Sequence, residues 1–79
     1  MNETRTYTVI LEPAEEGGFV VHVQALPEVV TEGDTEEEAL AMAKDAIELV
    51  LESRRELGEQ IPVEVGKAKV REVTVAITA

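Results

Sequence analysis

Apolar and polar side chains alternate over two early stretches of the chain, residues 6–12 and 19–25. A period of two places successive side chains on opposite faces of a β-strand, so both stretches are predicted to be half-buried strands. The side expected to face the core consists of Tyr7, Val9, Leu11, Phe19, Val21 and Val23. Pro13 and the pair Gly17-Gly18 lie between the strands, which favours a hairpin with a loop longer than two residues.

A helical spacing replaces the alternation after Thr35. Apolar residues then recur every three or four positions as Ala39, Leu40, Ala43, Ala46, Ile47, Val50 and Leu51. This spacing predicts a helix over residues 36–57 with one buried face. Thr35 followed three residues later by Glu38 is a capping-box pattern, and Gly58 is the expected C-terminal stop.

Two extended segments flank the helix. Residues 29–31 are predicted to be a short third strand, entered after a break at Pro27, which cannot donate a ladder hydrogen bond. Residues 69–78 are predicted to be a fourth strand. Its apolar side consists of Val73, Val75 and Ile77. Val70 is out of phase with that side, so we expect a bulge at residues 71–72.

The predicted order is β-β-β-α-β, an α+β fold in which a mostly antiparallel sheet carries one long helix on one face. If the helix is the crossover, a right-handed connection places the fourth strand beside the first and parallel to it. The chain of 79 residues fits a single domain, residues 1–79. A domain of this size buries only about 60% of its unfolded surface, so association with another chain is favoured.

Charge narrows the class of partner. The chain has 17 acidic and 7 basic residues, a formal charge of −10. Because nucleic-acid affinity comes largely from lysine and arginine, direct DNA or RNA binding is disfavoured. A basic protein partner suits this charge, although acidity that only keeps a small protein soluble is an equal alternative. There is no apolar run long enough to span a membrane, and we expect a cytoplasmic protein.

The sheet face that points away from the helix is predicted to lack permanent charges, although 30% of the residues are charged. Its expected members are Thr6, Thr8, Ile10, Val20, His22, Gln24, Thr74, Ala76 and Thr78. A neutral face of this kind fits a surface that a second copy covers in a homodimer or tetramer. The alternative is a neutral face that stays in water.

Catalytic chemistry finds little support in the sequence. Cysteine is absent, Ser53 is the single serine, and His22 stands alone. Nucleophilic catalysis needs an activated nucleophile beside a base, and a lone imidazole is more often structural. Glu12 is the one carboxylate on a core strand that metal-assisted nuclease chemistry could use. We therefore predict no enzyme activity, no cofactor and no metal site.

A run of fifteen residues, 26–40, resembles the motif of the HicB-like antitoxins at ten positions. In that family a run of the form LPG-C-x-T-x-GDT-x-EEAL leads into a helix. The matching residues here are Leu26, Pro27, Thr31, Gly33, Asp34, Thr35, Glu37, Glu38, Ala39 and Leu40. Glu28 and Val29 depart from it, where the family usually has glycine and cysteine. The resemblance implies a partial ribonuclease-H-like fold and assembly into dimers or tetramers.

The resemblance also implies a function, which is to bind and neutralise a HicA-like toxin, a small basic RNA-cleaving protein. From charge, we expect the toxin to meet an acidic surface made of Glu15, Glu16, Glu32, Asp34, Glu36 and Glu37. Many family members continue into a DNA-binding segment, and none is expected after the last strand here. The alternative function is a homo-oligomeric interaction module without a toxin, and the neighbouring gene would distinguish the two.

Overall fold

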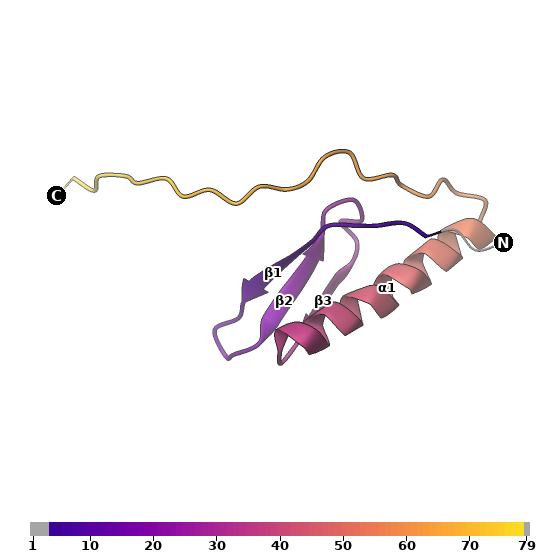
Figure 1. The fold of residues 1–79 in the computed structure, drawn as a ribbon, viewed down its shortest axis with the longest axis horizontal. Helices are drawn as coiled ribbons and strands as arrows, with labels where there is room; N and C mark the ends of the chain where they lie inside the picture. Colours follow the sequence, from indigo (N-terminus) through magenta and orange to yellow (C-terminus); the bar gives the residue numbers. More distant parts are fainter. Residues whose placement is uncertain (1–3, 79) are drawn as a thin grey trace.

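A computed structural model describes residues 4–78 of the chain. Three strands, β1 (Val9–Pro13), β2 (Phe19–Val23) and β3 (Val30–Gly33), are followed by one helix, α1 (Glu36–Glu56). The strands form an antiparallel sheet in the order β1-β2-β3, and α1 lies along it (Figure 1). The predicted α+β class and the predicted order of these first four elements are confirmed. Within residues 4–78, no helix is long and apolar enough to span a lipid bilayer.

The register of the first hairpin joins the two apolar sides that the sequence predicts. Val9 is opposite Val23, and Leu11 is opposite Val21. The loop that joins the strands is longer than two residues, as expected, and is closed by a hydrogen bond of 3.0 Å from the Ala14 amide to the Gly18 carbonyl. Both strands therefore present one continuous apolar surface to α1.

The core lies between the sheet and α1. One buried cluster consists of Val21, Ala39 and Ala43, and the other of Val23, Leu26 and Val29. Gly33 makes the close approach of the helix possible, because a Cβ added there would lie 2.4 Å from the Ala39 nitrogen. Val29 is a buried turn residue, so the third strand begins one residue later than predicted.

Both helix ends use the signals that the sequence contains. The Thr35 hydroxyl accepts a hydrogen bond of 3.0 Å from the Glu38 amide. The Glu38 carboxylate accepts from the Asp34 amide at 3.3 Å, one residue before the partner that a capping box predicts. At the other end, Gly58 has a φ of 72°, and its amide donates to the Arg55 carbonyl at 3.1 Å. The helix thus ends at Glu56, one residue before the predicted end.

The predicted fourth strand is wrong for this single chain. Residues 69–78, here called the tail, are extended but join no sheet, and no bulge forms because there is no ladder to interrupt. Figure 1 shows the tail running past β1 and away from the body of the fold. Thr74, Ala76 and Thr78 therefore lie on an exposed tail and not on a sheet face. Alternation specifies an extended conformation, but a strand also needs a neighbour to pair with.

Candidate functional site

The six predicted toxin-binding carboxylates lie at one end of the sheet. Glu15 and Glu16 are in the β1–β2 loop, and Glu36 and Glu37 begin α1. The two segments are adjacent because Phe19 pairs with Gly33 in the β2–β3 register. Figure 1 shows the loop and the helix start side by side at this end. All six side chains, which include Glu32 and Asp34, are exposed.

These six residues are called the acidic end below. The local structure explains why carboxylates gather there. A helix start carries partial positive charge from its free amides, which stabilises carboxylates in the first turn. Only Glu38 of the three first-turn glutamates is used in the cap, through the Asp34 amide. No group of three or more acidic, histidine or cysteine residues within 4–78 is arranged to hold a metal ion. Its six carboxylates are exposed and are distributed over the β1–β2 loop, the end of β3 and the start of α1.

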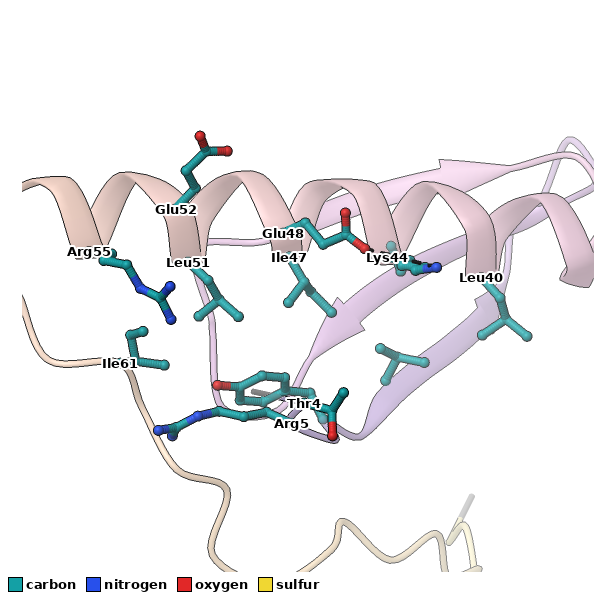
Figure 2. A pocket seen from close by; sticks show the side chains of 13 residues that line it. Thr4, Arg5, Leu40, Lys44, Ile47, Glu48, Leu51, Glu52, Arg55 and Ile61 are labelled. Carbon is teal, nitrogen blue, oxygen red and sulfur yellow. Dashed lines mark ion pairs between the residues drawn. The ribbon is translucent and has the colours of Figure 1, made fainter. Parts of the chain in front are cut away.

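A groove between α1 and the N-terminal part of β1 was not predicted. It has a volume of about 610 Å³ and is lined by Leu40, Ile47 and Leu51 from the helix and by Tyr7 and Val9 from the strand side. Figure 2 shows the three helix side chains pointing into it. One feature of the sequence could have indicated this groove: the apolar face of α1 is wider than a sheet of three strands can cover.

Polar contacts hold residues 59–68, here called the linker, against the residues just before β1 and just after β2. The Tyr7 hydroxyl donates to the Pro62 carbonyl at 2.7 Å, and the Thr8 hydroxyl donates to a Glu64 carboxylate oxygen at 2.7 Å. Hydrogen bonds from the Thr8 hydroxyl and amide hold the pKa of the Glu64 carboxyl below its usual range. Gln24 donates to the Gly66 carbonyl at 3.1 Å and accepts from the Ala68 amide at 2.6 Å.

The linker occupies two residues of the face that the sequence predicts for self-association. Thr8 and Gln24 bind the chain's own linker, and Thr6 is exposed next to it. Ile10, Val20 and His22 remain together, half-buried, on the face away from α1. The His22 Nε2 lies 3.6 Å from a Glu12 carboxylate oxygen, an ion pair only when the imidazole is protonated. Thr8 and Gln24 are thus engaged within the chain, and self-association through this face stays a prediction.

An ion pair that the sequence analysis did not predict fixes the loop before β3. The Arg54 guanidinium in the last turn of α1 contacts the Glu28 carboxylate. The hydrogen bond from Arg54 lowers the pKa of Glu28 and raises that of Arg54. Glu28 stands where the family motif usually has glycine. The departure from the motif thus has a structural use, since it links the loop to the helix.

Comparison with known proteins agrees with the motif in this region. A family model described as a HicB-like antitoxin of bacterial toxin–antitoxin systems matches residues 7–74. The chain belongs to the HicB-like antitoxin family. The match includes the capped helix start, the three strands and part of the exposed tail.

The chain is similar both to longer antitoxins and to a protein of about its own length. Antitoxin HicB 1 of Photorhabdus laumondii is 51% identical over 57 residues, which are 72% of this chain but 37% of the relative. Antitoxin HicB of Escherichia coli K12 is 42% identical over 57 residues, 41% of its length. A UPF0150 protein of Thermoplasma acidophilum is 46% identical over 56 residues, 81% of its length. The chain thus spans about two fifths of the length of the two named antitoxins.

Proposed function

We propose that this chain is a non-catalytic antitoxin domain that binds and neutralises a small basic HicA-like toxin through its acidic end. Family membership supports a toxin as the kind of partner. The observation that carries the choice of surface is the convergence of Glu15, Glu16, Glu36 and Glu37 at one end of the sheet.

The mechanism is steric and electrostatic. A toxin that cleaves RNA must present a basic surface to the phosphate backbone. The acidic end offers exposed carboxylates, and the cap at Thr35 and the close contact at Gly33 fix the start of α1 against the sheet. Opposite charges accelerate the encounter and suppress wrong partners, so the toxin's RNA-binding surface is covered and RNA is excluded.

The test uses the product of a small basic toxin gene adjacent to the gene for this chain. RNA cleavage by that product is measured with increasing amounts of the chain, at low and high salt. We expect Glu36→Gln with Glu37→Gln to weaken inhibition about tenfold or more, mainly through a slower association rate. The matched control is Glu52→Gln with Glu56→Gln, which removes the same charge at the other end of α1.

The outcome separates the two functions. Equal inhibition by both double variants would remove the acidic end from the interface. The lack of any binding between the chain and the adjacent toxin, or the lack of such a gene, would favour the second function, a homo-oligomeric module without a toxin. The exposed apolar tail is the observation that keeps this second function open.

A further inference from the structure

The single chain exposes more surface than a folded monomer of its mass. Its accessible surface is 6752 Å², whereas a monomer of 8.6 kDa is expected to expose about 4,700 Å². Its radius of gyration is 15.7 Å, against about 12 Å for a compact domain of this length. An isolated extended segment the length of the tail exposes roughly 1,600 Å². The tail therefore accounts for most of the excess.

The tail has the composition of a buried strand. Its apolar residues Val70, Val73, Val75 and Ile77 are 82%, 83%, 73% and 93% exposed. Branched side chains on alternate positions are favoured where a strand packs one side against a core. They are uncommon in extended segments that stay in water, which are typically rich in small and charged residues. The tail thus has the sequence of a strand, but it pairs with no strand among residues 4–78.

The outer edge of β1 could pair with such a segment. This strand is at the edge of the sheet, with β2 on one side only. The Thr8 carbonyl accepts from the Gln24 amide at 3.0 Å, so Thr8 faces β2, and Val9 and Leu11 direct their backbone groups to the free edge. The groove runs beside that edge, and its lining combines apolar side chains such as Leu40 and Ile47 with charged ones such as Lys44 and Glu48. An added strand would pair with β1 and place alternate side chains in the groove.

The tail of the same chain is carried away from this edge. The linker is bound first at Tyr7, then at Thr8, and then at Gln24, which follows β2. By Ala68, whose amide donates to Gln24, the chain has already crossed its own β1. To pair with that edge, the tail would have to reverse direction and break these contacts.

We propose that the tail of one chain adds to the β1 edge of a second copy, with Val73, Val75 and Ile77 filling that copy's groove, and that the exchange is reciprocal. Lys69 and Arg71 suit this role, because residues 1–68 have 16 acidic and 5 basic residues, whereas the tail has one acidic and two basic residues. If each tail buries half its surface and covers an equal area, the dimer buries about 3,200 Å², within the range of obligate interfaces. This assembly goes beyond the proposed function and does not depend on a toxin.

Sedimentation of the full chain at micromolar concentration gives the first test. We expect a dimer. Val75→Asp should raise the dimer dissociation constant about 100-fold or more, because a carboxylate in place of the valine would have to lose its water shell beside Leu40 and Ile47. Thr74→Asp, on the other side of the tail, should raise it less than tenfold. A monomeric wild-type chain, or equal effects of the two variants, would overturn the proposal.

Cross-linking identifies which chain fills the groove, even if a variant alters folding. Two single-cysteine chains, Ile10→Cys on the sheet and Thr74→Cys on the tail, are refolded together and treated with a short thiol cross-linker. We expect a covalent dimer of the two, and little product when Ser53→Cys, on the exposed side of α1, replaces Ile10→Cys. A chain with both Ile10→Cys and Thr74→Cys that closes only on itself would overturn the exchange.

Discussion

Replacing Gly33 by alanine should destabilise the fold far more than the size of one methyl group implies. The added Cβ would lie 2.4 Å from the Ala39 nitrogen and 2.6 Å from the Ala39 Cα, about an ångström closer than van der Waals contact allows. Both atoms belong to the helix backbone, so no side chain can rotate away. The first turn of α1 must therefore move from the sheet.

The magnitude follows from two costs. Overpacking in a close contact costs about 1–3 kcal/mol, and loss of the Thr35 cap costs about 1 kcal/mol more. A total of about 2–4 kcal/mol corresponds to a decrease of roughly 10–25 °C in melting temperature for a domain of this length. Far-UV circular dichroism at a fixed protein concentration measures the decrease.

Gly66→Ala is the matched control. Gly66 has a φ of 74°, but an added Cβ would meet nothing within 4 Å. Its cost is the left-handed backbone alone, about 1 kcal/mol. A Gly33→Ala chain that melts within a few degrees of the wild type, or no lower than Gly66→Ala, would refute the argument from close contact.

Two further predictions concern the polar contacts. Glu28→Gln should lower the melting temperature slightly at low salt and not at high salt, because its pair with Arg54 is partly exposed and is screened; thermal melts at two salt concentrations test this, and equal decreases would contradict it. Thr8→Val should reduce the decrease in melting temperature that accompanies acidification. The lowered pKa of Glu64 stabilises the fold above the usual carboxyl pKa, and this is lost as the pH falls through the lowered value. Melts between neutral and acid pH, with Thr6→Val as control, test this, and identical pH profiles would exclude the bond.

The first hairpin and α1 could be predicted because local patterns determine them. Alternation at residues 6–12 and 19–25 specified which sides of β1 and β2 face the core. The stop at Gly58 and the cap at Thr35 specified the ends of α1 to within one residue. In each case the residues that decide the structure lie within a few positions of one another.

Features that depend on contacts between residues far apart in the chain could not be predicted from the sequence. The acidic side chains could be proposed from charge, but their proximity depends on the pairing of Phe19 with Gly33. The link between Glu28 and Arg54 and the contact between Thr8 and Glu64 join residues 26 and 56 positions apart. The tail was predicted as a strand of its own sheet because alternation does not say which edge a strand joins.

The two proposed interfaces share no residue, so each can be tested without disturbing the other. The acidic end lies at the β1–β2 loop and the helix start, whereas exchange uses the β1 edge, the groove and the tail. Val75→Asp should therefore leave the affinity of each acidic end for a toxin in solution unchanged, while it removes the dimer. On a surface densely coated with toxin, the same variant should dissociate faster, because a dimer binds with two ends and a monomer with one. A loss of affinity in solution as well would mean that the tail forms part of the toxin interface and that the two surfaces are one.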